Sequence, residues 1–334
     1  MRRSGVICAG NWIVDLVHEI QHWPAEHNLV RIGGQSRSMG GGPANVIAAL
    51  CALETGFDLW PMGALGDDEY GAFIRQNCEA LGLDTSQMVV KPNIATAHTH
   101  VMSVAGQSRT FFYQGGANDA LSLDDFPAGT FSQTGARLFY LGYLTLLGEL
   151  DTFDGDGTTQ AAYVLERAQK AGLLTCVDLV SVHHDEFRNI ICAAAPFIDF
   201  LILNEIEAAR ATGVDADDDD LGDPLKLLKM GKDLLEAGVC KAVVLHCADR
   251  AVWMGTDGAR HLQPVDRLPG DQIISHLGAG DAFCSGILYA VHEGWEPQEA
   301  LQLANTVARE SLKGTSASEA IPSLSQLIKT PTPS

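Results

Sequence analysis

The chain has 334 residues, is 46% hydrophobic, and carries 42 acidic against 22 basic residues, which gives a formal net charge of −20. A chain of this length and hydrophobicity can bury a large core, so it is globular. The acidic excess argues against a nucleic-acid partner and against binding to an anionic membrane surface.

The N-terminal apolar stretch at residues 5–10 is too short for a signal peptide, and no apolar run approaches membrane-spanning length. Eight cysteines are scattered without a C-x-x-C pair, mostly within apolar runs, so we expect reduced core residues. The expected location is therefore the cytoplasm, with no membrane partner.

Short apolar runs alternate with helical patterns along the chain. Strands are expected at residues 5–9, 138–141, 173–177, 200–203 and 242–245, and helices at 44–53, 68–80, 160–171, 225–237 and 280–292. This alternation is typical of an α/β fold, a mostly parallel sheet covered by helices on both faces. Residues 12–38 and 94–114 interrupt it, and we expect them to form a small second sheet that covers a cleft or pairs with a second subunit. Irregular excursions that only pack on the core are the alternative.

A glycine cluster with polar neighbours marks the first candidate site. Gly40, Gly41 and Gly42 precede a helix, where they allow the backbone to approach a ligand, and Asn45 offers a donor and an acceptor to a polyhydroxy compound. Upstream, Asp15 can accept from two vicinal hydroxyls. A tight strand-to-helix turn and a turn aspartate are the alternatives.

A second candidate site follows the expected strand at 200–203. Asn204 and Glu207 stand at a helix start, where both side chains can face one hydrated magnesium ion. The same spacing also fits a capping box, in which Asn204 caps the helix and Glu207 closes the box. The aspartate-rich segment at residues 215–223 lacks the spacing of a calcium loop and reads as a solvated loop.

A third glycine motif suits phosphoryl transfer. Gly278, Ala279 and Gly280 form a turn directly before a helix, and Asp281 stands in its first turn. Free N–H groups at a helix start favour an anion, and a carboxylate beside them can accept the proton of an attacking hydroxyl. A glycine C-cap next to an aspartate N-cap is the structural alternative.

Together these segments resemble the PfkB family, the ribokinase-like carbohydrate kinases. The order and spacing of five motifs agree over residues 5–325. The motifs are Gly41-Gly42-Pro43-Ala44-Asn45, the Gly63–Gly71 segment with Asp67 between its glycines, Gly116-Ala117-Asn118, Asn204-Glu205-Ile206-Glu207, and Gly278-Ala279-Gly280-Asp281 with Phe283 and Gly286. Five matches in order are hard to attribute to chance.

The resemblance implies one kinase unit over residues 1–334, a Rossmann-type three-layer domain with a small β-sheet lid, which transfers the ATP γ-phosphate to a hydroxyl. Asp281 would be the general base, and the backbone of Gly278, Ala279 and Gly280 the anion hole. The sugar would be held by Asp15, Gly41, Gly42 and Asn45. The nucleotide would be bound by Asn204, Glu207 and Asn305, with Glu207 reaching magnesium through water and Asn305 lining the adenine pocket.

Three departures from the family pattern affect this reading. Ser275 replaces a carboxylate associated with activation by monovalent cations, which argues against potassium dependence. Residues 245–250 lack a hydroxyl and two glycines near the nucleotide phosphates. Arg250 or His276 can supply compensating positive charge, and the alternative is that both are exposed residues that touch no ligand. Residues 178–181 lack the D-x-N-x-R pattern of several sugar kinases.

Three functional readings follow. The first is an ATP-dependent sugar kinase, and the second is a nucleoside kinase whose lid would use Trp12, Trp23, Phe111 and Phe112. The third is a degenerate member that binds a sugar or nucleotide without catalysis. Because exposed edges of a small sheet are natural pairing surfaces, we also expect a homodimer through the lid.

Overall fold

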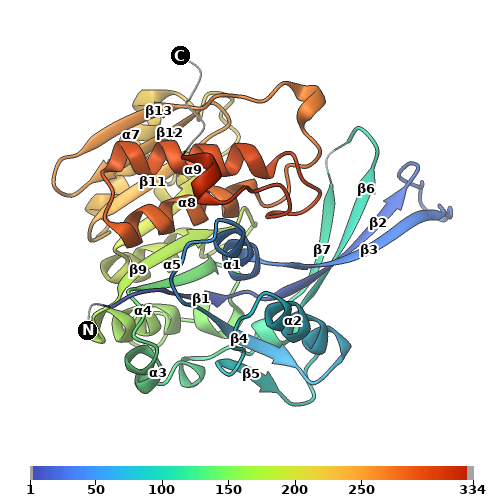
Figure 1. The fold of residues 1–334 in the computed structure, drawn as a ribbon, viewed down its shortest axis with the longest axis horizontal. Helices are drawn as coiled ribbons and strands as arrows, with labels where there is room; N and C mark the ends of the chain where they lie inside the picture. The colour runs from blue at the N-terminus through green and yellow to red at the C-terminus, as the bar shows by residue number, and fades with distance from the viewer. Residues whose placement is uncertain (1–2, 108, 329–334) are drawn as a thin grey trace.

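The computed structural model describes residues 3–107 and 109–328; the remaining positions of the expected unit 1–334 lie outside the described residues. A nine-stranded sheet crosses the molecule in the order β13-β12-β11-β10-β9-β8-β1-β4-β5 (Figure 1). Its parallel strands are β1 (Val6–Gly10), β4 (Leu59–Gly66), β5 (Met88–Lys91), β8 (Leu138–Leu144), β9 (Leu174–Leu179), β10 (Phe200–Asn204) and β11 (Ala242–His246). An antiparallel extension at one edge adds β12 (Arg250–Gly255) and β13 (Arg260–Pro264).

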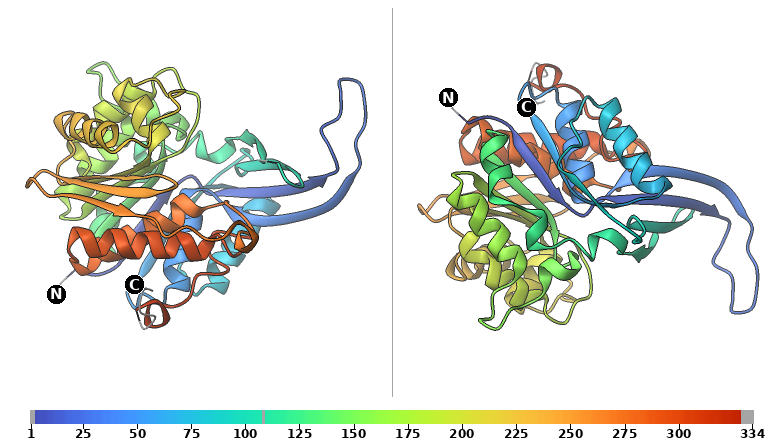
Figure 2. Two further views of the ribbon diagram at one scale, coloured as in Figure 1. Left: turned by 90° about the horizontal axis from the view of Figure 1, so that it is seen from above. Right: turned by 90° about the horizontal axis from the view of Figure 1, so that it is seen from below.

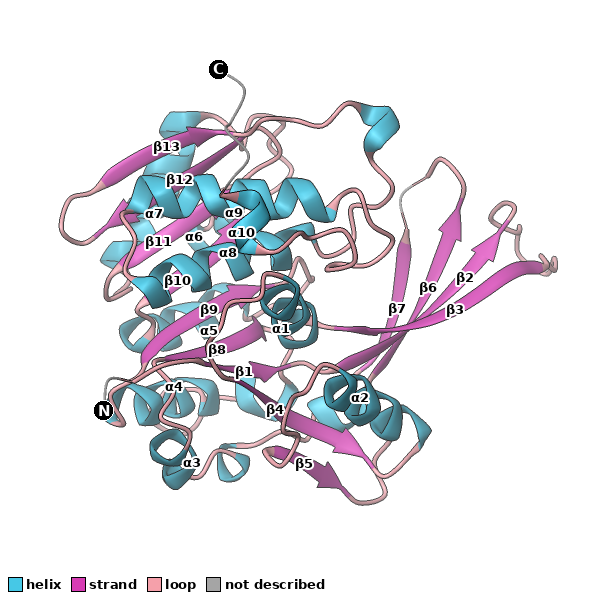
Figure 3. Ribbon diagram, in the orientation of Figure 1, coloured by secondary structure: helices cyan, strands magenta, loops and turns pink. Residues whose placement is uncertain are grey.

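Helices cover both faces of this sheet, which makes three layers (Figure 3). One face carries α3 (Ala128–Gln133), α4 (Gln160–Lys170), α5 (Phe187–Ala194), α6 (Glu205–Thr212) and α7 (Pro224–Glu236). The other carries α1 (Gly42–Ala52), α2 (Glu69–Ala80), α8 (Ala279–Glu293) and α9 (Pro297–Ser311), and α10 (Leu324–Leu327) closes the described chain.

The central strands of the sheet are buried on both faces because they are apolar throughout, whereas the edge strand β13 is partly exposed. In β1, Ile7 and Ala9 pack toward α4 and α5, whereas Val6 and Cys8 pack toward α1 and α8. Such strands read as continuous hydrophobic runs rather than alternating ones, which is typical of parallel sheets. The expected α/β architecture is therefore confirmed.

A four-stranded sheet projects from the main body as a lid, in the order β3-β2-β6-β7 (Figure 2). Its strands are β2 (Ile13–Ile20), β3 (Ile32–Gly40), β6 (His98–Val104) and β7 (Thr110–Gln114). The lid comes from two hairpins that leave the main sheet after β1 and after β5, and β2 pairs with β6 in parallel. The expectation of a small second sheet is confirmed.

Several polar segments of the sequence fall where a parallel strand of the main sheet ends. Gly10 ends β1, Asn204 ends β10 and His246 ends β11, so the segments that follow them meet at one edge of the sheet. Ligands bind at this carboxyl edge in open α/β folds. Within the described residues, no helix is both long and apolar enough to cross a membrane.

Candidate active site

Asp281 is the centre of the site and stands in the first turn of α8. The carboxylate is buried, and its Oδ2 accepts hydrogen bonds from Asn45 Nδ2 at 2.8 Å and from the Tyr143 hydroxyl at 3.2 Å. Asn45 comes from α1, 236 positions away in sequence. The fold thus joins the first and last glycine motifs of the chain at one carboxylate.

Burial raises the pKa of Asp281 to about 7, and the two hydrogen bonds from Asn45 and Tyr143 partly offset that rise. The nearby carboxylates of Glu207 and Asp15 add to the rise by electrostatic repulsion. A base works best when its pKa lies near the working pH. The carboxylate is therefore able to take up and release a proton near neutrality.

The start of α8 presents unpaired backbone donors beside this carboxylate. Gly278 caps the helix with φ 73°, and the N–H groups of Gly278, Gly280 and Asp281 make no hydrogen bond within the described residues. The N–H of Ala279, which was also expected in the anion hole, donates to the His276 backbone oxygen at 3.4 Å. A β-carbon at Gly278 would lie 2.3 Å from Cβ of Ala317, so glycine is required by both backbone conformation and space. This arrangement suits an anion at the helix end.

The lid contributes Asp15 to the same site. Asp15 lies in β2, 8% exposed, and burial raises its pKa to about 6 against the lowering effects of a Thr99 hydrogen bond and the Arg109 charge. A β-carbon at Gly40 would lie 2.1 Å from Asp15 Oδ2, so β3 passes closely over the carboxylate. Asp15 is therefore a buried carboxylate that the lid brings close to Asp281.

Gly41 and Gly42 form the turn between β3 and α1. Gly41 has φ 88°, and a β-carbon there would lie 2.0 Å from the backbone oxygen of Asn11. At Gly42 a β-carbon would lie 2.8 Å from the Tyr140 hydroxyl and 2.9 Å from the Tyr143 ring. Both positions require glycine, and they bring α1 and Asn45 against the carboxylate of Asp281.

A polar cavity of about 360 Å³ opens above Asp281. Its lining includes Asn204 and Glu207 from the start of α6. The capping box exists, because Asn204 Oδ1 accepts from the Glu207 N–H at 2.9 Å and Glu207 Oε2 accepts from the Asn204 N–H at 3.0 Å. Glu207 Oε1 also accepts from the Ser181 hydroxyl at 2.9 Å. The structural alternative for this motif is thus confirmed, and both side chains still face the cavity.

A second, mainly apolar cavity of about 420 Å³ adjoins the first. It lies between the C-terminal end of β11, the loop after β13, and helices α8 and α9, and its lining includes Phe283, Leu268 and Asn305. Nδ2 of Asn305 is buried without a hydrogen-bond partner. The cavity combines flat apolar walls with one free amide donor, which suits a heterocyclic ring.

Arg250 and His276, the two residues considered able to compensate for the altered 245–250 segment, differ in their position relative to the two cavities. Arg250 pairs with Asp249 at 2.7 Å and lines neither cavity. His276 lines both. Arg250 is therefore not placed to compensate for the altered 245–250 segment, whereas His276 is.

Sequence reasoning missed several residues of the site. Asp178, at the end of β9, accepts from the Tyr143 N–H at 2.9 Å, and burial together with the Asp281 charge raises its pKa well above the usual range. Tyr143 has φ 62°, outside the usual range for a bulky residue. In the sequence, only the positions of Tyr143 and Asp178 near the ends of two strands pointed to the site. Their interactions with Asp281 join segments that are far apart in the chain.

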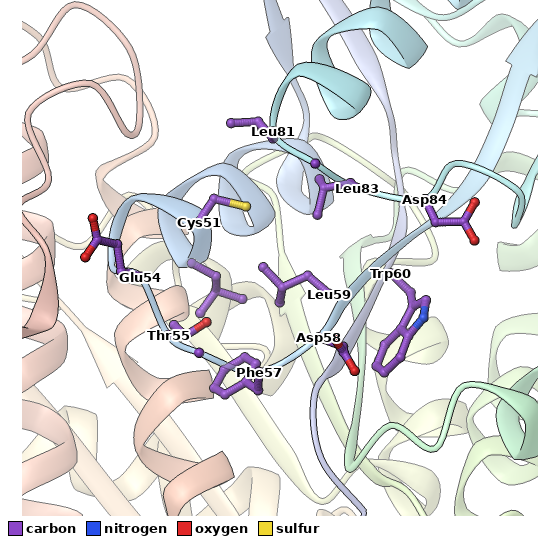
Figure 4. A pocket seen from close by; sticks show the side chains of 13 residues that line it. Cys51, Glu54, Thr55, Phe57, Asp58, Leu59, Trp60, Leu81, Leu83 and Asp84 are labelled. Carbon is purple, nitrogen blue, oxygen red and sulfur yellow. The ribbon is translucent and has the colours of Figure 1, made fainter.

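A third hollow lies away from this site, at the amino ends of the strands (Figure 4). It has a volume of about 540 Å³ and is lined by the end of α1, the start of β4 and the segment after α2. Its charged lining residues are Glu54, Asp58 and Asp84, all acidic. None of the residues expected in the site lies there, and its charge does not suit a phosphate.

Comparisons with known proteins agree with this geometry. Aminoimidazole riboside kinase of Salmonella typhimurium is 25% identical over 306 residues, which cover 86% of each chain. Fructokinase-1 of Zea mays is 25% identical over 300 residues, which cover 86% of this chain and 83% of that one. The structure of Arabidopsis thaliana ribokinase complexed with ribose and ATP has a TM-score of 0.78 at 21% identity, covering 98% of each chain, so the fold is ribokinase-like.

A model of the pfkB family of carbohydrate kinases matches residues 4–324. The match spans nearly the whole chain and includes both glycine motifs that meet at Asp281. The protein belongs to the pfkB family and is a carbohydrate kinase, a phosphotransferase with an alcohol group as acceptor.

Proposed function

We propose that the protein transfers the γ-phosphate of ATP to a hydroxyl of a sugar bound beneath the lid. The observation that carries the proposal is the buried Asp281 carboxylate, whose pKa is about 7 and which stands beside the unpaired N–H groups of the α8 start. A base and an anion hole in one helix turn are what phosphoryl transfer to an alcohol requires.

In the proposed reaction, the substrate O–H bond breaks and its proton passes to an Asp281 oxygen. The substrate oxygen forms a bond to the γ-phosphorus as the bond between that phosphorus and the bridging oxygen breaks, and ADP leaves with that oxygen. The N–H groups of Gly280 and Asp281 stabilise the charge on the transferred group. Catalysis then depends mainly on positioning and charge stabilisation.

On the substrate side, Asp15, Asn45 and the turn at Gly41 and Gly42 hold the sugar in this proposal. Support comes from the proximity of the two carboxylates, since the charge of Asp15 contributes to the raised pKa of Asp281. A compound with several hydroxyls can donate to Asp15 while presenting one hydroxyl to Asp281.

Magnesium is part of the proposal through Glu207 and Asn204. The Glu207 carboxylate lines the polar cavity, is 4% exposed, and is fixed by Asn204 and Ser181. A carboxylate held in this way fits a hydrated magnesium ion, which keeps several waters and binds phosphate oxygens. When bound, the ion would neutralise phosphate charge near these side chains.

A riboside or nucleoside acceptor is the alternative within the same chemistry. One of the relatives acts on a riboside, as its name states. Phe111 is 53% exposed and lies in β7 on the same face as Asp15, where it can stack on a base. Trp12 is unavailable for that role, because it is fully buried and its Nε1 donates to the Met62 backbone oxygen at 2.8 Å.

The test is ATP consumption by the purified protein with magnesium, against pentoses, hexoses, sugar acids, phosphosugars and nucleosides. We expect turnover on a sugar, and we expect Asp281→Asn to lower it by about 10² or more while ligand affinity stays within a few-fold. Turnover on nucleosides alone would favour the alternative. Retained turnover in Asp281→Asn would remove the assigned base, and sugar binding with no ATP binding would indicate a non-catalytic member.

A further inference from the structure

The polar and the apolar cavity meet at a junction formed by four residues. His246, His276, Ala279 and Gly280 are the residues that line both. If the base of a nucleotide occupies the apolar cavity and the reacting phosphate lies at Asp281, its phosphate chain must pass this junction. The inference below therefore rests on the proposed function.

His246 forms one wall of the junction. It ends β11, and its ring lies against Phe283 of α8 with the ring centroids 4.9 Å apart. A β-carbon at Gly280 would lie 3.4 Å from Cε1 and 3.7 Å from Nε2 of His246. The imidazole thus lies against Gly280 in the first turn of α8, with Cε1 and Nε2 as the nearest ring atoms.

The imidazole of His246 has no partner of its own. No hydrogen bond joins either ring nitrogen to another residue of the described part of the chain. Burial lowers the pKa of His246 to about 4, so the ring is neutral at pH 7 and carries one N–H donor. A half-buried ring without a partner, beside a helix start, has a donor available for a ligand.

The charges around the junction make this donor important. The polar cavity is lined by the carboxyl groups of Asp178, Glu207 and Asp281 and by no lysine or arginine of the described chain. These carboxylates repel a phosphate chain, and the side chains and backbone that line the polar cavity offer only the α8 N–H groups, His246 and His276 to offset that repulsion. An imidazole donor at the junction supplies the missing attraction without adding a fixed positive charge beside Asp281.

We propose that His246 binds the phosphate chain of the nucleotide at this junction, donating its ring N–H to a phosphate oxygen beside the first turn of α8. His246 is then a positioning residue for the phosphate donor, in a segment that lacks the hydroxyl and glycines expected there. His276 also lines this junction.

Binding measurements separate this role from a packing role. We expect His246→Leu to weaken ATP binding by about tenfold or more, since a hydrogen bond to a charged group is lost, and to leave adenosine binding within twofold. His246→Gln keeps an N–H donor near the same place and should recover most of the ATP affinity. The matched control is His261→Leu in β13, a histidine that lines neither cavity and should change neither affinity.

A second measurement uses the wild-type protein, so it does not depend on the folding of a variant. A bound phosphate favours the imidazolium form, so the pKa of the His246 ring should rise on addition of ATP and stay unchanged with adenosine. Site-specific NMR of the ring is needed because other ionisable side chains line the two cavities. They are the acidic residues Asp178, Glu205, Glu207, Asp266 and Asp281, the basic residues His276, Arg267 and Arg309, and Tyr143 and Cys247.

The outcomes distinguish this inference from the proposed function. Equal weakening of ATP and adenosine binding in His246→Leu would show that the ring only packs, and unchanged ATP affinity would show that it makes no contact. Either result, with wild-type turnover intact, overturns the role of His246 and leaves the kinase mechanism in place. Wild-type protein that neither binds nor consumes ATP would overturn both.

Discussion

At the residue scale, the site depends on two buried carboxyl groups, Asp178 near the end of β9 and Asp281 in the first turn of α8. The charge of Asp281 contributes to the raised pKa of Asp178. Two acids in one low-dielectric space do not both ionise readily. Asp178 therefore favours its neutral form, while Asp281, held by Asn45 and Tyr143, is the group available as a base.

Tyr143 lowers the pKa of Asp281, the base of the proposed mechanism. The Tyr143 hydroxyl donates a hydrogen bond to Asp281 and thereby lowers the pKa of this carboxyl group. Loss of the hydroxyl in Tyr143→Phe should therefore raise the pKa of Asp281 by about one unit. In the proposed mechanism the deprotonated form of Asp281 is the active one, so we expect activity to rise with pH through about 7 in the wild type and through a higher value in the variant. We expect a several-fold loss of kcat/KM at pH 6 and little loss at pH 9.

The control for this profile is Tyr163→Phe. The Tyr163 hydroxyl donates to Asp154 at 2.6 Å in an exposed loop and lies outside the site, so the pH profile should match the wild type. A Tyr143→Phe profile that keeps its midpoint, with activity lowered equally at every pH, would contradict the tuning role.

At the scale of elements, Asp68 fastens the lid to the body. It caps α2 by accepting from the Gly71 N–H at 2.8 Å, and it also accepts from the N–H and hydroxyl of Thr96, just before β6. Thr96 is fully buried. One carboxylate therefore joins a helix start of the main body to the base of a lid hairpin.

Removal of this carboxylate should destabilise the fold. Asp68→Ala loses a cap and leaves the buried Thr96 N–H without its partner, which we expect to cost about 2 kcal/mol. The measurement is urea unfolding, with Asp84→Ala as the control, because Asp84 accepts only from nearby Ser86 on the surface. Equal stability of Asp68→Ala and Asp84→Ala would contradict the fastening role.

The elements that the sequence predicted are those whose own pattern decides their structure. The helix expected at 280–292 corresponds to α8 (Ala279–Glu293), and the strand expected at 242–245 to β11 (Ala242–His246). β4 was not predicted, because Pro61 and its glycines disfavour a strand locally and its pairing with β1 decides the outcome. Contacts such as Tyr143 to Asp281 were unpredictable for the same reason, since they join positions 138 residues apart.

At the scale of the whole molecule, the lid carries much of the exposed apolar surface. Trp23, Leu29, Ile32, Phe111 and Phe112 are exposed by 43%, 90%, 47%, 53% and 52%. Its outer strands β3 and β7 are open edges of the small sheet. Exposed apolar side chains beside open edges mark a surface suited to association.

We therefore predict a homodimer that pairs through the lid. Sedimentation at micromolar concentration should give twice the chain mass of 35.7 kDa, and the double substitution Leu29→Ser with Phe112→Ser should give the monomer. Leu225→Ser is the control, because Leu225 is 76% exposed on α7, in the main body. A wild-type monomer at that concentration would contradict the prediction.

In each lid hairpin, the backbone just before the first strand contacts the backbone just after the second strand. The first is closed where a β-carbon at Gly41 would meet the Asn11 oxygen, and the second where the Ala117 N–H donates to the Ala95 oxygen at 2.8 Å. Each hairpin is thus a loop whose ends are already joined by the core. Such segments can be lengthened, shortened or exchanged without reshaping what lies beneath. If the sugar binds beneath the lid as proposed, acceptor specificity is modular in this scaffold, and a grafted lid would offer a route to new substrates while the segments around Asp281 stay in place.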